Sequence, residues 1–120
     1  MRRLYATLLA LTLSPGLAAC ADDGYAGGLP AAPTELRAVL APAGGVTLTW
    51  TDASDDEDGF VVERLAEGAG TSFATLTQVG ENVVTYTDMT AASGKGYRYR
   101  VQAVNGYGEA ASNEAAVTVP

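Results

Sequence analysis

The strongest constraint on the fold is a run of strict alternation near the carboxyl end of the chain. Apolar or aromatic side chains take every second position and polar side chains the positions between: Tyr97, Tyr99, Val101 and Ala103 against Arg98, Arg100 and Gln102. Successive side chains of a β-strand point to opposite faces, so this run predicts a strand with one buried and one solvated face. Asn105-Gly106 then predicts a turn.

Shorter runs rich in Val, Thr, Tyr and Leu predict the rest of a sheet structure. They are separated by Gly, Asp and Ser clusters about every ten residues, a spacing typical of all-β proteins. We place these strands at residues 34–40, 46–51, 60–65, 75–79, 83–87 and 115–119. No stretch has useful helical periodicity, so the prediction is an all-β, seven-stranded, immunoglobulin-like antiparallel β-sandwich, with a barrel as the alternative.

The 120 residues divide into three segments. Residues 1–19 predict an export signal, since Arg2 and Arg3 precede the apolar run of residues 4–13. That run is too short for a transmembrane helix, which needs about 20 apolar residues. Residues 20–31 are rich in Gly and predict a flexible tether, in which residues 21–31 span about 35 Å at full stretch. Residues 32–120 form the one domain that this length allows.

The end of the signal carries a motif, Leu17-Ala18-Ala19-Cys20, that resembles the lipobox of bacterial lipoproteins. The resemblance implies cleavage before Cys20, diacylglycerol on its sulfur and an extracytoplasmic, lipid-anchored protein. Ala21, which stands where enteric lipoproteins retained in the inner membrane have Asp, implies the outer membrane. The alternative is an ordinary signal peptide cut near Ala19 or Ala21 that leaves a free cysteine.

The net charge and the cysteine content limit the kinds of partner and of stabilisation that this protein can have. Without residues 1–19 the chain has five basic and fourteen acidic side chains, a net charge of −9. This balance disfavours nucleic acid as a partner, because phosphates require a basic surface. Cys20 is the single cysteine, so the domain must be held together by packing rather than by a disulfide.

Three stretches carry a family resemblance: residues 46–52, residues 57–64 and residues 97–108. Together they resemble strands of bacterial fibronectin type III domains, over about residues 33–119. The resemblance implies that Trp50 is the core tryptophan and that Tyr97 is a corner tyrosine whose hydroxyl bonds nearby backbone. Ala91 and Ser93 depart from the family's usual Leu and Pro, which implies a looser corner. The predicted structural core is Trp50, Phe60, Val62, Tyr97, Tyr99 and Val101.

The residue types argue against catalysis. The chain has no histidine, which removes the commonest general base and the usual serine or cysteine triads. Four serines lie in apparent turns without a basic partner: Ser54, Ser72, Ser93 and Ser112. Lys95 also lies in a turn, flanked by Gly. We therefore predict that the protein is not an enzyme and has no cofactor.

A dense acidic run, Asp52 to Asp58, is the one candidate for a metal site. Crowded carboxylates repel one another, and a hard cation such as calcium relieves that repulsion, with Asp55, Asp56 and Asp58 as the candidate ligands. The stronger interpretation is that these residues cap turns, because the run lacks the spacing of an EF-hand loop.

Two residues of the predicted turn after residue 103, Asn105 and Tyr107, are the candidate ligand contacts. An exposed loop tyrosine combines apolar area with a hydroxyl at low entropic cost. The alternative is that Tyr107 folds back over its loop. Arg98 and Arg100, on the outward face of their strand, are expected to pair with acids such as Glu63.

These observations predict a non-catalytic envelope lipoprotein whose single module binds a protein or polysaccharide through the loops at one end. A purely structural lipoprotein without a ligand and a calcium-dependent loop-binding module are the alternatives. A carbohydrate-active accessory module is disfavoured, because no catalytic domain accompanies it. The exposure of Tyr25, Tyr107 and Phe73 would discriminate glycan contact from a structural role.

Overall fold

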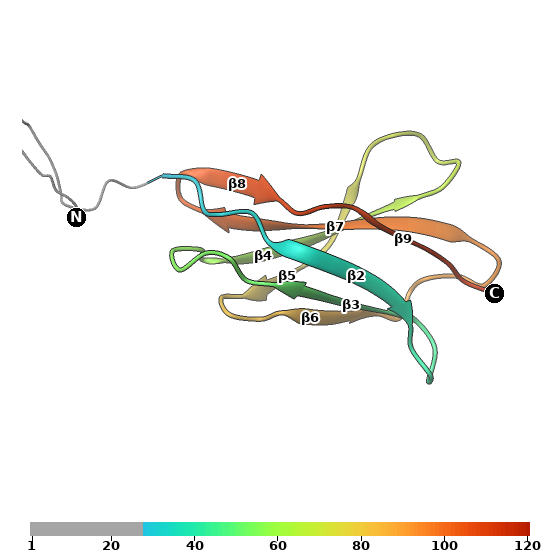
Figure 1. Ribbon diagram of the computed structural model, residues 1–120. Coiled ribbons are helices and arrows are strands. Elements are labelled where there is room, and N and C mark those ends of the chain that lie inside the picture. Colours follow the sequence, from blue (N-terminus) through green and yellow to red (C-terminus); the bar gives the residue numbers. More distant parts are fainter. Residues whose placement is uncertain (1–27) are drawn as a thin grey trace, which may run out of the picture.

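A computed structural model describes residues 28–120, and these residues form two antiparallel sheets packed face to face (Figure 1). The predicted all-β sandwich is confirmed. Eight strands lie within the described part: β2 (Thr34–Leu40), β3 (Val46–Thr51), β4 (Gly59–Ala66), β5 (Ala74–Gly80), β6 (Thr85–Asp88), β7 (Gly96–Asn105), β8 (Gly108–Ala111) and β9 (Ala115–Thr118). The signal peptide, Cys20, Tyr25 and most of the tether lie outside the described residues.

One sheet has three strands in the order β2-β3-β6, and the other has the order β5-β4-β7-β8, with β9 also paired to β7. Each predicted segment corresponds to a strand. The structure differs from the prediction at the carboxyl end. There an additional strand, β8, precedes the predicted last strand and follows the predicted turn directly. The sequence of β8, Gly-Glu-Ala-Ala, has neither alternation nor strong β-formers, so it carried no strand signal.

Both final strands lie along the same edge of β7. β8 pairs with residues 102–105 and β9 with residues 96–99. Between them, the Ser112 amide donates to the Val101 carbonyl at 2.8 Å, and the Val101 amide donates to Ser112 Oγ at 3.0 Å. The chain then turns aside at Asn113, which lets β9 also lie against β2 of the other sheet.

The core occupies the space between the two sheets. The alternating residues of β3, Val46, Leu48 and Trp50, are buried, and β4 adds Phe60 and Val62. The ring centroids of Trp50 and Phe60 are 5.7 Å apart, edge to face. The apolar face of β7 completes this layer with four buried residues: Tyr97, Tyr99, Val101 and Ala103.

The side chain of Asn113 connects the two sheets along one side of the sandwich. β2 has an irregularity between Thr34 and Arg37, where Glu35 has a φ of 57°. At this irregularity the Leu36 amide donates to Asn113 Oδ1 at 3.0 Å, and Asn113 Nδ2 donates to the Leu36 carbonyl at 3.1 Å. The Asn113 amide therefore takes the place of a neighbouring strand and joins the two sheets.

The two ends of the sandwich differ in what they carry. The described chain begins at Gly28, beside the loops of residues 52–58 and 105–108, because Asn105 bonds to both segments. The carboxyl terminus and the loop between β4 and β5, yellow-green in Figure 1, lie at the opposite end. Across residues 28–120, no helix has the length and apolarity to span a bilayer.

Candidate functional site

The loop that carries the candidate contact residues is braced by one amide side chain. Asn105 Nδ2 donates to the Gly28 carbonyl at 3.0 Å and to the Asp56 carbonyl at 3.3 Å, while Asn105 Oδ1 accepts from the Tyr107 amide at 2.8 Å. The side chain of Asn105 is thus used within the fold, where it ties three segments together. Of the two candidates, Tyr107 remains available for contact.

Tyr107 lies at the tip of this loop with 64% of its surface exposed, too much for a ring folded back over its own loop. Leu29, 62% exposed, lies beside the next residue, Gly108, on the incoming chain. A Cβ added at Gly108, where φ is 143°, would lie 2.6 Å from Leu29 Cδ2, so the two segments touch. This loop end therefore presents a small apolar tip made by Tyr107 and Leu29.

The acidic run next to this tip caps its own turns. Asp52 Oδ1 accepts from the Ser54 amide at 3.0 Å, and Asp56 Oδ1 accepts from Ser54 Oγ at 2.6 Å. No group of three or more His, Cys, Asp or Glu side chains between residues 28 and 120 could hold a metal ion. Asp55, Asp56 and Asp58 are consequently not brought together as calcium ligands, and the turn-capping interpretation agrees with the geometry.

Glu57 behaves differently from its acidic neighbours, because it is 4% exposed. Its Oε2 accepts from the amide of Asn82 at 3.3 Å, across the loop end, while its Oε1 has no hydrogen-bond partner. The indole Nε1 of Trp50 is the other buried side-chain polar atom without a partner in the described chain. Glu57 therefore links the loop of residues 52–58 to the turn before β6.

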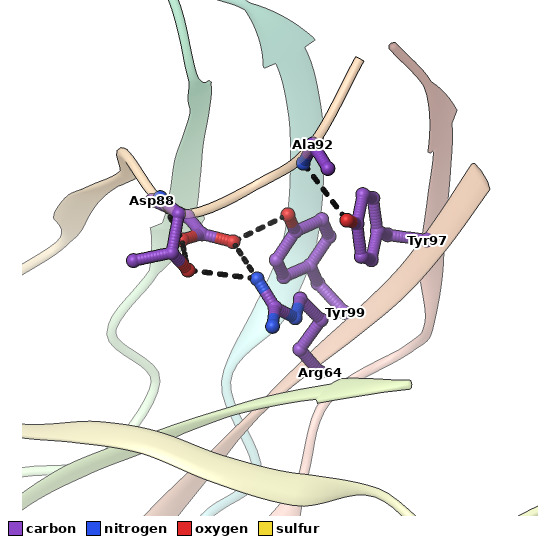
Figure 2. Close-up of polar contacts among 6 residues, drawn as sticks. Arg64, Asp88, Ala92, Tyr97 and Tyr99 are labelled. Carbon is purple, nitrogen blue, oxygen red and sulfur yellow. Dashed lines mark hydrogen bonds and ion pairs between the residues drawn. The ribbon is translucent and has the colours of Figure 1, made fainter. Parts of the chain in front are cut away.

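A buried polar cluster, drawn in Figure 2, lies at the other end of the core, where Asp88 pairs with Val46 and Tyr97 with Ala66. Asp88, fully buried, accepts from Arg64 Nη1 at 3.0 Å and from the Tyr99 hydroxyl at 2.8 Å, both through Oδ2. Its Oδ1 accepts from the amide and the hydroxyl of Thr90, at 2.9 and 2.6 Å. Every oxygen of this carboxylate is satisfied, which is the condition for keeping a charge inside a core.

The cluster shifts the titration of its members. Burial raises the pKa of Asp88, but the hydrogen bonds from Thr90, Tyr99 and Arg64 outweigh it and hold the pKa below the ordinary value of 3.8. Burial, together with the hydrogen bond to Asp88, raises the pKa of Tyr99 well above its ordinary value of 10.0. Asp88 is therefore ionised and Tyr99 neutral around pH 7.

Beside this cluster the corner tyrosine makes the bond that the family resemblance implied. The Tyr97 hydroxyl accepts from the Ala92 amide at 2.8 Å, and the Arg64 guanidinium lies 4.8 Å from the centre of the Tyr97 ring (Figure 2). The expected looseness at Ala91 and Ser93 is offset at one point, because Ser93 Oγ donates to the Pro120 carbonyl.

This polar cluster was not predicted from the sequence, although the alternation of inward and outward side chains along the strands indicates it. Asp88 shares a strand face with Tyr86, and Arg64 shares one with Phe60 and Val62, so each strand places one charge on its inward face. Two opposite charges at inward positions of neighbouring layers predict an internal ion pair. The partners could not have been assigned without knowing the strand order.

On the outer face of β7 the arginines pair with acids. Arg100 Nε donates to Glu63 Oε1, as expected, and its guanidinium lies 4.3 Å from the centre of the Phe73 ring. Arg98 Nη1 is 3.4 Å from Glu114 Oε1, and both side chains are about half exposed. This face is solvated and carries no excess of positive charge.

Solved structures give the context for this geometry. A crystal structure of an Fn3-like protein from Clostridium thermocellum is 34% identical, with a TM-score of 0.63, over 76% of this chain and 94% of that chain. Titin domains A168–A170 give 25% identity and a TM-score of 0.64, over 76% of this chain and 32% of theirs.

A pectate lyase, Pel3 from Pectobacterium carotovorum, gives 22% identity and a TM-score of 0.64 over 72% of this chain and 27% of its own, which shows the fold alone. No protein-family model matches the sequence, and no curated protein matches it.

Proposed function

The chain belongs to the Fn3-like (fibronectin type III) family, and on that premise we propose that it is a non-catalytic binding module of the bacterial cell envelope, anchored by lipid on Cys20. Its partner in this proposal is another envelope protein or a polysaccharide, and its membrane is the outer membrane, by the resemblance at Ala21. Nucleic acid is not a partner, since the chain is acidic.

The observation that carries the proposal is the exposure of Tyr107 on a rigid support. An aromatic side chain carried on an ordered loop backbone loses less conformational entropy on binding than one on a flexible loop, so its apolar area contributes to affinity. Asn105 supplies that order through its bonds to Gly28, Asp56 and Tyr107. The loop is thus held in place, and most of the Tyr107 side chain is open to a partner.

The anchor determines where this contact takes place. The eight residues after Cys20, up to Gly28, reach about 26 Å at full extension, and Gly28 lies at the Tyr107 end of the sandwich. An anchor at Cys20 would place the Tyr107 end of the domain toward the membrane. Exposed acids surround the tip, Asp55, Asp58 and Glu109, and they repel anionic lipid headgroups. A membrane-proximal protein or glycan suits this end better than the bilayer itself.

The absence of catalysis is supported by how the hydroxyl groups are used. Ser54 Oγ donates to Asp56, Ser93 Oγ donates to the Pro120 carbonyl, and Ser112 Oγ donates to the Asn113 carbonyl. These three serines are each engaged with an acceptor inside the fold, and the chain has no histidine to activate a serine. These contacts stabilise turns and give no nucleophile with a base.

A purely structural role is the second candidate. It is favoured by the internal pairing of the charges on the outer face of β7, Arg98 with Glu114 and Arg100 with Glu63, because these two cations already have partners within the fold. In that case the protein is a spacer on the envelope, and Tyr107 is exposed without a ligand.

A crosslinking pull-down from intact envelopes tests the loop contact. The variant is Tyr107→Ala, and the matched control is Met89→Ala, which removes an equally exposed side chain, 64%, from the connection after β6. Loss of a crosslinked partner in Tyr107→Ala but not in Met89→Ala supports the binding module. Identical partner sets from the wild type and both variants contradict it and support the spacer.

Metabolic labelling with radioactive palmitate tests the anchor separately. We expect the wild type to carry label in the outer-membrane fraction and Cys20→Ser to lose both the label and the membrane association. A wild type without label would support the ordinary signal peptide instead.

A further inference from the structure

A groove of about 470 Å³ lies on the outer face of the five-stranded sheet, apart from the Tyr107 loop. The loop between β4 and β5, residues 67–73, forms one side of it, and the solvent-facing side of β7 forms the other. That loop rises at the end of the sandwich opposite Gly28 (Figure 1), so an anchored domain would present the groove away from the membrane. A volume of this size is within the usual range for ligand sites, about 300–1,000 Å³.

The groove has an ordered apolar surface. Leu65 lines the groove and is 8% exposed. Leu65 does not belong to the core cluster, and its partner on β7 is the exposed Arg98. The Phe73 ring also lines the groove, and the Arg100 guanidinium holds it from 4.3 Å while itself bonded to Glu63. An aromatic ring held in this way needs little further ordering to receive a ligand.

The polar walls offer both donors and acceptors. Arg98 and Glu114 are joined by one contact of 3.4 Å, with 51% and 46% of their side chains exposed. An exposed ion pair of this kind is worth about 1 kcal/mol or less, so either group can turn to a ligand. Glu67 and Thr71 line the groove from the loop.

The rim is open because glycine forms part of it. Gly68 and Gly70 have φ values of 85° and 98°, and a Cβ at either position would meet nothing within 4 Å. At these two positions the loop presents only backbone to the groove, and a ligand can approach that backbone closely.

The lining selects a class of ligand. Two carboxylates against one guanidinium disfavour phosphates and other anions, and an open, mainly polar lining disfavours hydrocarbon. A pyranose ring fits both features, since its C–H face can lie on Phe73 and Leu65 while its hydroxyls pair with a guanidinium donor and carboxylate acceptors. We propose that this groove binds a neutral saccharide.

Two-dimensional NMR of the purified protein tests this assignment. The probes are neutral hexasaccharides of glucose (β-1,4 and α-1,4 linked), mannose and N-acetylglucosamine, with a hyaluronan hexasaccharide as the anionic comparison. We expect at least one neutral probe to shift amide signals of residues 67–73 and of Arg98, and hyaluronan to shift none of them. Neutral probes without effect at about 10 mM, or shifts confined to residues 105–108, overturn the proposal.

Variants localise the binding. Phe73→Ala is expected to weaken binding about tenfold. Met89→Ala, which removes an exposed side chain outside the groove lining, is expected to leave binding unchanged. Arg98→Gln and Glu114→Gln change exposed groups without touching the aromatic surface, and each is expected to weaken binding severalfold even if Phe73→Ala does not fold. Binding that is equal in the wild type, Arg98→Gln and Glu114→Gln overturns the proposal.

Discussion

The Tyr99 hydroxyl donates a hydrogen bond of 2.8 Å to Asp88 Oδ2, and both side chains are fully buried. This bond joins β7 of one sheet to the end of β6 in the other, and Arg64 and Thr90 complete the shell of the carboxylate. A charge in the core is tolerated here because each of its oxygens has a donor. The stability of the fold should therefore respond to the loss of any one of these donors.

Tyr99→Phe removes one donor and leaves the ring in place. A hydrogen bond to a charged group contributes about 1.5–3 kcal/mol, and the free energy of unfolding should fall by that amount. Urea denaturation at neutral pH measures the change. Tyr107→Phe, which deletes an exposed hydroxyl, is the control and should change stability by less than about 0.5 kcal/mol. Equal stability in the wild type and Tyr99→Phe would contradict the bond.

The lowered pKa of Asp88 predicts a loss of stability in acid. Because the folded-state pKa lies below the ordinary value of 3.8, the ionised form stabilises the fold above that pH, and the contribution disappears as the pH falls through the folded pKa. Asp88→Asn should be less stable than the wild type near neutrality, and the difference should narrow at about pH 3. Urea midpoints across this window provide the measurement. A difference that stays constant down to that pH would count against an ionised Asp88.

Asn113→Ala should loosen the seam between the sheets. It leaves the amide and the carbonyl of Leu36 without their partners, at a cost of about 1–3 kcal/mol. Hydrogen exchange should accelerate at the Leu36 amide in particular. Glu114→Ala, which breaks only an exposed ion pair, is the neighbouring control and should leave that amide protected. Unchanged exchange at Leu36 in Asn113→Ala would show that the bridge is not formed in solution.

Two glycine substitutions should differ sharply in cost. A Cβ at Gly59 would lie 2.5 Å from the Val79 carbonyl oxygen on the paired strand, so the backbone of β4 or β5 must move. Gly59→Ala should destabilise by about 3 kcal/mol or more. At Gly96 the atoms nearest to a new Cβ are the end of the Glu67 side chain, which can swing aside, and Gly96→Ala should cost less than about 1 kcal/mol. Thermal unfolding of the two variants gives the comparison, and similar midpoints would contradict it.

Much of the fold follows from alternation alone. Residues 97–103 and 46–50 show a period of two without interruption, and the structure buries their apolar faces against Phe60 and Val62. β8 escaped prediction because its short Gly-Glu-Ala-Ala sequence has no such period and is a strand only because β7 lies beside it. Local pattern thus predicted the strands that fill the core, while pairing alone explains β8.

The candidate sites were less predictable, since they depend on contacts between distant segments. The exposure of Tyr107 depends on how Asn105 holds Gly28 and Asp56, which are 77 and 49 residues away in sequence. The groove requires the loop of residues 67–73 to stand beside β7, and nothing in the loop's Gly-rich sequence sets that position. Asn113 likewise gave no signal, because its role depends on the irregularity in β2.

The placement of the chain's two ends has a mechanical consequence. The described chain enters at Gly28 and leaves at Pro120 at opposite ends of the long axis, through β2 and β9 (Figure 1). Tension between an anchored N-terminus and a load on the C-terminus would run along these two strands. The hydrogen bonds that pair β2 with β3 and β9 with β7 are perpendicular to that force. They would therefore resist shear together instead of breaking one by one. The Asn113 bridge lies between the two loaded strands and would share that force.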